Sequence, residues 1–192
     1  MGKSTFAACM EKEYGATVCS NDRYWLSQRR TYSLAEHCDR AVPWCQRICE
    51  GALQRRCPIV ILDNLNMKIS NFERMYTQAK LLGFAVVVVD LQAKDLGTAR
   101  AAVVRNQRPT WGDQECAEMA NQWHKYEPLP QTWHATVICG DGEPCVGSSL
   151  VQRVANAMCG ADATLPPPSE AAAATGRHGA VGAFTHCSLQ DI

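Results

Sequence analysis

A glycine, a lysine and two hydroxyl side chains follow one another near the start of the chain, as Gly2-Lys3-Ser4-Thr5. A Gly-Lys-Ser/Thr run that opens a helix is the last part of a phosphate-binding loop, G-x-x-x-x-G-K-[ST]. In that loop, backbone N–H groups cradle the phosphates, the lysine reaches the β- and γ-phosphates, and the hydroxyl binds Mg²⁺. The four residues are therefore candidates for binding ATP, with Ser4 as the Mg²⁺ ligand. A run this short also fits a helix start that is capped by serine.

Carboxylates and carboxamides follow two predicted strands. Asp22 comes shortly after the apolar run 16–19, and Asp63-Asn64-Leu65-Asn66 follows the stronger run 58–62. In an open α/β sheet the carboxyl ends of the strands border the crevice where ligands bind, so we expect Asp22, Asp63, Asn64 and Asn66 to meet there. Asn64 and Asn66 are the residues expected to bind the acceptor. The alternative for Asn21-Asp22 is an Asx turn or a helix cap.

Two arginines stand close together just ahead of Pro109: Arg105 ends a predicted helix, and Arg108 follows in the next segment. We expect them in a lid, where they could neutralise charge on a phosphoryl group in transfer. A Gly-Lys-Ser run, an acidic loop, an Asp-Asn pair after a buried strand and an arginine pair are together the parts that phosphoryl transfer requires.

The elements that must position these residues alternate along the chain. Apolar runs predict strands at 16–19, 58–62, 84–89 and 136–139. Helical periodicity predicts helices at 5–14, 41–53, 72–82, 97–105, 114–126 and 149–158, the third starting from a Ser70-to-Glu73 capping box. Gly15 and Gly83 are expected to end helices, and His37 is expected to be a surface or capping residue. Such alternation indicates a parallel sheet built from βαβ units.

Length and composition favour one domain, at 1–159, followed by a tail. The chain has 192 residues, 46% of them hydrophobic. From residue 160 to 192 the composition shifts to Ala, Pro, Gly and Ser, so we expect this tail to be disordered.

Charge and cysteine usage narrow the class of protein further. The formal net charge is zero, so no global field draws the chain to nucleic acid or membrane. The 11 cysteines are odd in number and no two form C-x-x-C. We therefore expect free, mostly buried thiols and an intracellular location, cytoplasmic or nuclear, with no membrane partner. A metal site built from cysteines is the least favoured interpretation.

By the order and spacing of these motifs, residues 2 to 128 resemble the polynucleotide 5′-hydroxyl kinases and related P-loop kinases. The similarity is greatest to the group that contains the kinase domain of NEDD-four-binding protein two. Asp63-Asn64-Leu65-Asn66 is similar to the family's Asp-Asn-Thr-Asn, and Arg105-Asn106 to its Arg-Asn lid pair. The chain departs from the family at Leu65, Val42 and 107–109, where the family commonly has Thr, His and Val/Ile-His-Gly.

The resemblance implies a fold and a set of roles. The fold would be a kinase-like P-loop NTPase, a three-layer α/β/α sandwich with a parallel sheet. Asp22 would be the general base toward the acceptor hydroxyl, and Asp63 would help position the acceptor and the metal-bound water. In this family a strand precedes the phosphate-binding loop and lies at the centre of the sheet. We therefore expect a sheet that lacks its first strand, in a truncated product or in a divergent, inactive relative.

Three functions remain open from the sequence. The first is an ATP-dependent phosphotransferase that acts on the 5′-hydroxyl end of a polynucleotide, with a local basic groove formed by Arg23, Arg29, Arg30, Arg55 and Arg56. The second keeps the chemistry but uses a small metabolite or nucleoside as the acceptor. The third is a binding module that keeps the fold without catalysis.

Overall fold

The computed structural model describes residues 3–33, 36–66, 68–91, 95–105, 112–124, 133, 136–139, 154 and 181–186. Within these residues, no helix has the length and apolar character needed to cross a membrane. The helices are α1 (Lys3–Tyr14), α2 (Asn21–Ser27), α4 (Val42–Gln54), α5 (Glu73–Leu81), α6 (Leu96–Arg105) and α7 (Asp113–His124). Two short helical turns, η1 (His37–Ala41) and η2 (Ile69–Asn71), complete the helical elements of the described chain.

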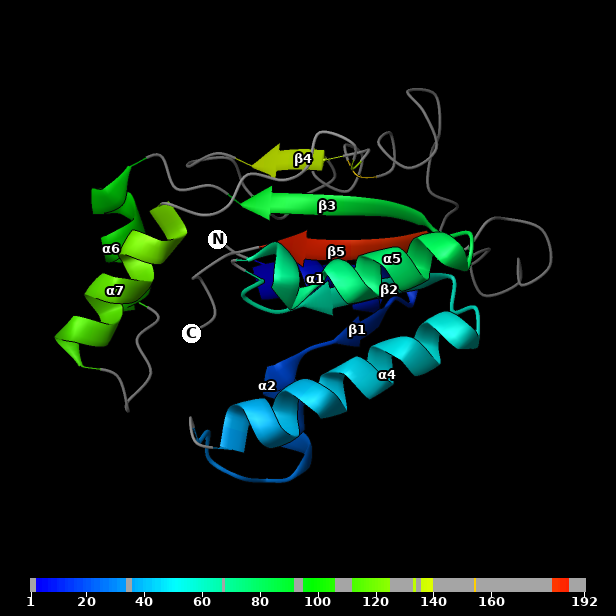
Figure 1. The fold of residues 1–192 in the computed structure, drawn as a ribbon, viewed down its shortest axis with the longest axis horizontal. Coiled ribbons are helices and arrows are strands. Elements are labelled where there is room, and N and C mark those ends of the chain that lie inside the picture. The colour runs from blue at the N-terminus through cyan, green and yellow to red at the C-terminus, as the bar shows by residue number, and fades with distance from the viewer. Residues whose placement is uncertain are drawn as a thin grey trace.

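A parallel sheet forms the centre of the fold, with the strand order β1-β2-β5-β3-β4 (Figure 1). The strands are β1 (Thr17–Cys19), β2 (Ile59–Asp63), β3 (Ala85–Leu91), β4 (Thr136–Cys139) and β5 (Val181–His186). Every residue of β2 is buried, which is typical of a strand that is covered on both faces of a parallel sheet. The four strands predicted from the sequence are all present.

Helices cover both faces of the sheet. Successive side chains of a strand point to opposite faces. On one face, Phe6 and Met10 of α1 pack with Ile61 of β2. On the other face, α4 and α5 pack against Val60 of β2 and Val88 of β3. This gives the predicted three-layer α/β/α arrangement, with α1 in one outer layer and α4 and α5 in the other (Figure 1).

The expectation of a disordered tail is wrong for residues 181–186. This segment is β5, which lies between β2 and β3 in the centre of the sheet. Ala183 is in register with Ile61 on one side and with Val87 on the other. Without β5, facing backbone groups of two buried strands would lack partners, and each lost hydrogen bond would cost about 1–3 kcal/mol. The central position is thus occupied by a segment from near the chain's C-terminus.

Two helix ends agree with the sequence-based prediction, and one helix start does not. Gly15 and Gly83 have φ angles of 65° and 78°, the left-handed conformation that glycine adopts at helix C-termini. The predicted capping box is wrong, because Ser70 lies within η2 and α5 begins at Glu73 after an N-cap residue, Phe72, that makes no side-chain cap. Instead, the Asn71 side chain accepts a hydrogen bond from the Lys68 backbone N–H at 2.9 Å and so fixes the η2 turn.

Two helices, α6 and α7, lie beyond the carboxyl edge of the sheet, to which the arrowheads of β3 and β5 point (Figure 1). They pack against each other and match the predicted helices 97–105 and 114–126 within a few residues. The predicted helix 149–158 lies outside the described residues except for Val154, which is buried with α1.

Candidate functional site

The first turn of α1 and the end of β2 meet in a buried ion pair. The Lys3 Nζ atom lies 2.6 Å from Asp63 Oδ1, and both side chains are about 95% buried, with exposed fractions of 5% and 4%. Ser4 Oγ donates to the second carboxylate oxygen, Asp63 Oδ2, at 2.7 Å. Lys3 Nζ also lies 3.3 Å from Ser4 Oγ. One carboxylate therefore holds both side chains that the sequence assigned to phosphate and Mg²⁺.

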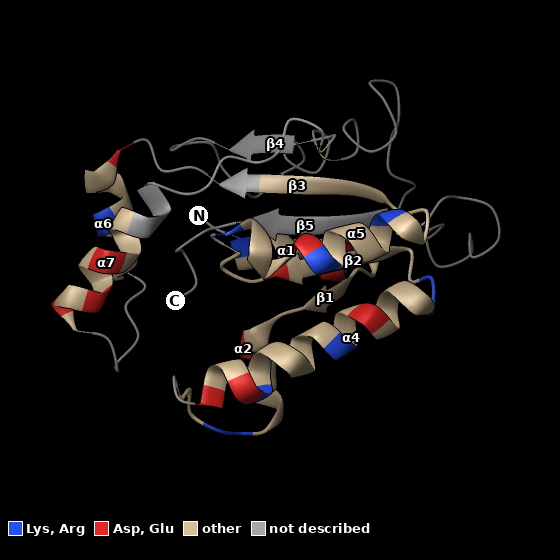
Figure 2. Cartoon of the chain, in the orientation of Figure 1, with Lys and Arg blue, Asp and Glu red and all other residues tan. Residues whose placement is uncertain are grey.

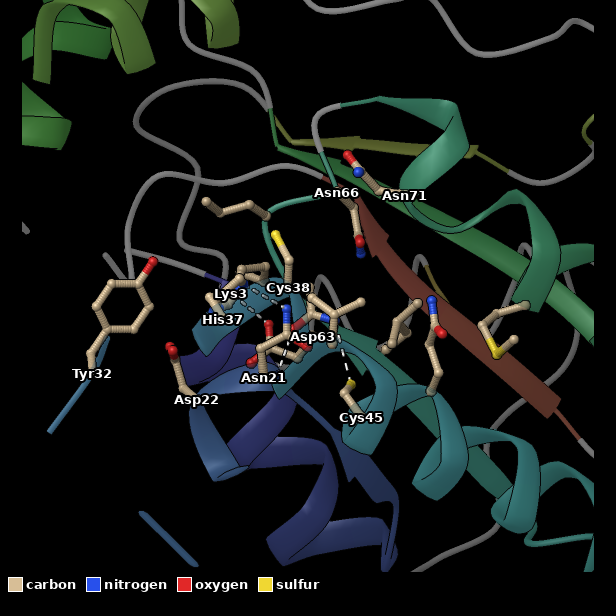
Figure 3. Close-up of a pocket in the computed structure, with 16 residues that line it drawn as sticks. Lys3, Asn21, Asp22, Tyr32, His37, Cys38, Cys45, Asp63, Asn66 and Asn71 are labelled. Atoms are coloured by element: carbon tan, nitrogen blue, oxygen red, sulfur yellow. Dashed lines mark hydrogen bonds and ion pairs between the residues drawn. The ribbon is translucent and has the colours of Figure 1, made fainter. Parts of the chain in front are cut away.

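Asp22 comes from the first turn of α2, directly after β1. Ser20 is the N-cap of this helix, and its hydroxyl accepts a hydrogen bond from the Asp22 backbone N–H at 3.2 Å. The Asp22 side chain is half-buried and lines the same cavity as Lys3 and Asp63 (Figure 3). The cap is therefore Ser20, whereas Asn21 and Asp22 lie within the helix that it starts, and Asp22 presents its carboxylate to the cavity.

Carboxamides connect the ends of β1 and β2. Asn64 Oδ1 accepts a hydrogen bond from the Asn21 backbone N–H at 2.8 Å, and Asn64 Nδ2 donates to Cys45 Sγ at 3.5 Å. Asn66 is buried and has a φ of 44°, a left-handed conformation that asparagine tolerates better than most residues. With both ends of its amide engaged, Asn64 fixes the position of Asn21 relative to β2.

These residues open on a cavity of about 310 Å³ at the carboxyl edge of the sheet (Figure 3). Its charged lining residues are Lys3, Asp22 and Asp63. Carboxamides form much of the remaining polar lining, and they are Asn21, Gln46, Asn64, Asn66 and Asn71. A volume of this size is at the small end of the range for ligand pockets, about 300–1,000 Å³.

Several lining residues of this cavity, among them His37 and Tyr32, were missed by the sequence analysis. His37, expected at the surface, is half-buried in η1, and its Nε2 atom lies 3.3 Å from Asn21 Nδ2. Tyr32 lines the cavity beside it, with ring centroids 5.4 Å apart. Tyr32 also packs edge-on against Trp25 of α2, so aromatic contacts bring the chain after α2 back to the site. No local sequence signal indicates that the chain after α2 returns to the site. Asn21 could have been suggested as a site residue, because it stands next to Asp22 in the sequence.

The two cysteines at the cavity differ in their surroundings. Cys38 is exposed, whereas Cys45 is buried, and burial raises the pKa of the Cys45 thiol to about 12. Cys45 is therefore a neutral thiol at physiological pH and is no nucleophile. The cysteines whose side chains the structure describes are free, in agreement with the predicted free thiols, and they are Cys9, Cys19, Cys38, Cys45, Cys49, Cys57 and Cys116.

The remaining predicted site residues are only partly described. Thr5 is half-buried in the first turn of α1 and is not among the residues that line the cavity. Arg105 is the last residue of α6, beyond the carboxyl edge of the sheet, and its side chain is not described (Figure 1). Gly2 and Arg108 lie outside the described residues.

The oxygen atoms beside Lys3 suit a magnesium ion. Mg²⁺ in phosphoryl-transfer sites is commonly held by one or two protein oxygen ligands together with substrate phosphates and water. The Ser4 hydroxyl and the Asp63 carboxylate, 2.7 Å apart, provide such ligands. In the described part of the chain, no group of three or more His, Cys, Asp or Glu side chains is placed to hold a metal ion without added ligands.

Comparison with known protein families agrees with this arrangement. The sequence model of a family described as an AAA domain matches residues 1–126. The chain belongs to this AAA-domain family. Neither the comparison with curated proteins nor the one with solved structures gave a match.

Members of this AAA-domain family have a kinase-like P-loop fold, so the predicted fold class is confirmed. The matched region contains α1, β1, β2 and β3, and therefore includes Lys3, Asp22 and Asp63. Membership indicates a P-loop nucleotide-binding domain with kinase-like character. The narrower resemblance to polynucleotide 5′-hydroxyl kinases stays a prediction.

Proposed function

We propose that this protein is a kinase that transfers the γ-phosphoryl group of Mg·ATP to a hydroxyl group of an acceptor. The observation that carries the proposal is that Lys3, Asp22 and Asp63, which come from three different elements, line one cavity at the carboxyl edge of a parallel sheet. Ligands of open α/β proteins bind at this edge. The AAA-domain family membership supports nucleotide binding at the same place.

Each residue of the site has a role in this proposal. When bound, Mg·ATP supplies the phosphoryl group, and the metal ion neutralises part of its charge. Lys3 would bind phosphate oxygens, and Ser4 and Asp63 would hold the metal ion. Asp22 would accept the proton of the acceptor hydroxyl, because a half-buried carboxylate on the same cavity can orient and deprotonate it. Arg105 and Arg108 keep their predicted role of stabilising charge in the transition state.

Asn64 and Asn66 were both expected to bind the acceptor, and the contacts separate their proposed roles. The Asn64 amide already bonds to Asn21 and Cys45, so we assign it to positioning Asn21. Asn66 lines the cavity from a buried, left-handed position and is the better candidate for direct contact with a ligand.

The test is transfer of labelled γ-phosphate from Mg·ATP to a panel of hydroxyl acceptors, made with four variants. Asp22→Asn removes the proposed base, and Asp39→Asn removes an exposed carboxylate of η1 as its control. Lys3→Arg keeps a cation opposite Asp63 but changes the shape of the phosphate-binding group, and Lys12→Ala removes an exposed lysine of the same helix as its control. Thermal unfolding of each variant establishes that it is folded.

We expect Asp22→Asn to lower the turnover number by about 10²- to 10⁴-fold, the usual contribution of a general base. Lys3→Arg should weaken Mg·ATP binding, and both controls should behave as wild type. Mg·ATP at 100 times its dissociation constant should stabilise the wild-type protein by about 2.7 kcal/mol. Absence of both transfer and nucleotide-dependent stabilisation would refute the kinase and favour a non-catalytic binding module. Normal turnover in Asp22→Asn would refute the assigned base.

A further inference from the structure

The described lining of the cavity carries little positive charge. Among the described lining residues the only Lys or Arg is Lys3, and it is already paired with Asp63 at 2.6 Å. Asp22 adds a second carboxylate, so one lysine faces two aspartates. An acceptor that brings its own phosphate groups would meet a lining whose described charges sum to a negative value.

Three of the five arginines expected to form a basic groove have other contacts. Arg23 makes a bidentate pair with Glu11, with Nη1 2.7 Å from Oε1. Arg30 lies 2.9 Å from Glu36. Arg56, at the far end of α4, donates to the Leu82 carbonyl oxygen. Figure 2 shows the lysines and arginines of the described chain spread over several helices and loops, with acidic residues among them. Of the described lysines and arginines, Lys3 alone is among the residues that line the cavity.

The lining offers neutral hydrogen-bonding groups instead. Each carboxamide provides both donors and acceptors, which suits the hydroxyl groups of an uncharged ligand. The Asn21 Oδ1 atom is buried and has no hydrogen-bond partner among the described residues, and Asn21 lines the cavity. A buried acceptor atom without a partner destabilises the site, and a hydroxyl group of a ligand would remove that cost. The tilted rings of Tyr32 and His37 add a surface on which a ligand ring can pack.

Resting on the proposed kinase function, we infer that the acceptor is an uncharged, polyhydroxylated small molecule of sugar or nucleoside size. The lining carboxamides other than Asn64 would bind its hydroxyl groups, with Asn21 Oδ1 accepting from one of them. Asp22 would face the hydroxyl that is phosphorylated. A polynucleotide 5′ end, which carries phosphate groups beside its hydroxyl, is the competing acceptor.

The experiment compares these acceptors by two independent measurements. In the first, labelled phosphate transfer from Mg·ATP is measured to uncharged nucleosides, to neutral sugars and polyols, and to a 5′-hydroxyl oligonucleotide. In the second, the rate of alkylation of Cys38, an exposed residue of the cavity lining, is followed by peptide mass spectrometry with each acceptor present and no ATP. The second measurement reports acceptor binding even if no transfer occurs.

We expect transfer to a neutral acceptor with a kcat/KM above that for the oligonucleotide, and slower Cys38 alkylation with that neutral acceptor only. Asn21→Ala should raise the KM of the neutral acceptor by about 2- to 10-fold, with the KM of ATP unchanged. Asn121→Ala, an exposed asparagine of α7, is the control and should behave as wild type.

Three results would overturn the inference. They are preferred transfer to the oligonucleotide, protection of Cys38 by the oligonucleotide alone, and protection by no acceptor in the panel. The first of these leaves the kinase intact, because phosphate has still been transferred. Loss of nucleotide-dependent stabilisation with Cys38 still protected by a neutral ligand would instead refute the kinase and retain the neutral binding site.

Discussion

The buried ion pair between Lys3 and Asp63 leads to a test of stability that needs no ligand. Removal of one partner leaves the other as a buried charge, whereas removal of both leaves none. We therefore expect Lys3→Met and Asp63→Leu each to lower the free energy of unfolding strongly, and the double variant Lys3→Met/Asp63→Leu to be more stable than either single variant.

The magnitude follows from the geometry of the pair. At 2.6 Å and an effective dielectric constant of about 20, the attraction is about 332/(20 × 2.6), or roughly 6 kcal/mol. Desolvation costs several kcal/mol per ion, so the net value of the intact pair is small. Loss of one partner of such a pair typically costs about 3–5 kcal/mol. We place Lys3→Met near the lower value, because Asp63 retains the 2.7 Å hydrogen bond from Ser4.

The assay is urea unfolding of the wild type, both single variants and the double variant at one pH and ionic strength. A loss of about 3 kcal/mol should also lower the melting temperature by roughly 6–12 °C in a chain of this size. Equal m-values across the four proteins would show that the same surface is exposed on unfolding. Single-variant losses below about 1 kcal/mol, or a double variant as unstable as the sum of the singles, would refute the buried pair.

Four further outcomes are expected. Hydrogen bonding to Arg23 holds the pKa of Glu11 below its usual value, so this pair should add stability above about pH 4.5 that is lost as the pH falls below it. Because both side chains are about 40% exposed, the loss should be under about 1 kcal/mol. Melting temperature measured against pH should show this loss in the wild type and not in Arg23→Gln. Ala183→Pro, which removes a backbone donor from the central strand β5, should destabilise the fold by about 3 kcal/mol or more in urea unfolding, whereas Ala183→Ser should cost far less. At pH 8, iodoacetamide should alkylate exposed Cys38 well before Cys45, whose pKa is about 12, and the opposite order would contradict the burial of Cys45. Mg·ATP should raise the melting temperature by more than the sum of the increases caused by ATP in EDTA and by Mg²⁺ without ATP. An increase of the same size when EDTA is present would exclude the metal ligands proposed at Ser4 and Asp63.

The residues that converge at the site could be predicted because each follows from a pattern in its own short stretch of sequence. β2 and β3 are continuous apolar runs, and such runs identify strands that are buried on both faces. Once those strands are parallel, their carboxyl ends share one edge, so Asp63 must lie near the other strand ends and near the helix that Lys3 opens. The sequence thus leads to the charged core of the site without knowledge of any long-range contact.

The residues that were missed depend on contacts between distant segments. Val181–His186 has no marker that separates it from the Ala- and Gly-rich chain before it, and its strand conformation follows from the unpaired position between β2 and β3. His37 reaches the cavity only because Tyr32 packs on Trp25 and then on His37. Ser70 fits a capping pattern, but the Asn71 side chain one residue later accepts the hydrogen bond that fixes the turn. In the first two cases contacts between distant segments decide between alternatives that the local sequence leaves equal, whereas at Ser70 the deciding hydrogen bond is local.

The contacts of Asp63 connect the stability of the fold with the proposed chemistry. Its two oxygens are used separately, Oδ1 by Lys3 and Oδ2 by Ser4. A phosphate that draws Lys3 away would leave this buried carboxylate without its cation, at a cost that only another cation can offset. A magnesium ion held by Asp63 and Ser4 would supply that charge at the same oxygens. On the proposed function, this buried ion pair would therefore couple the binding of nucleotide to the binding of the metal ion.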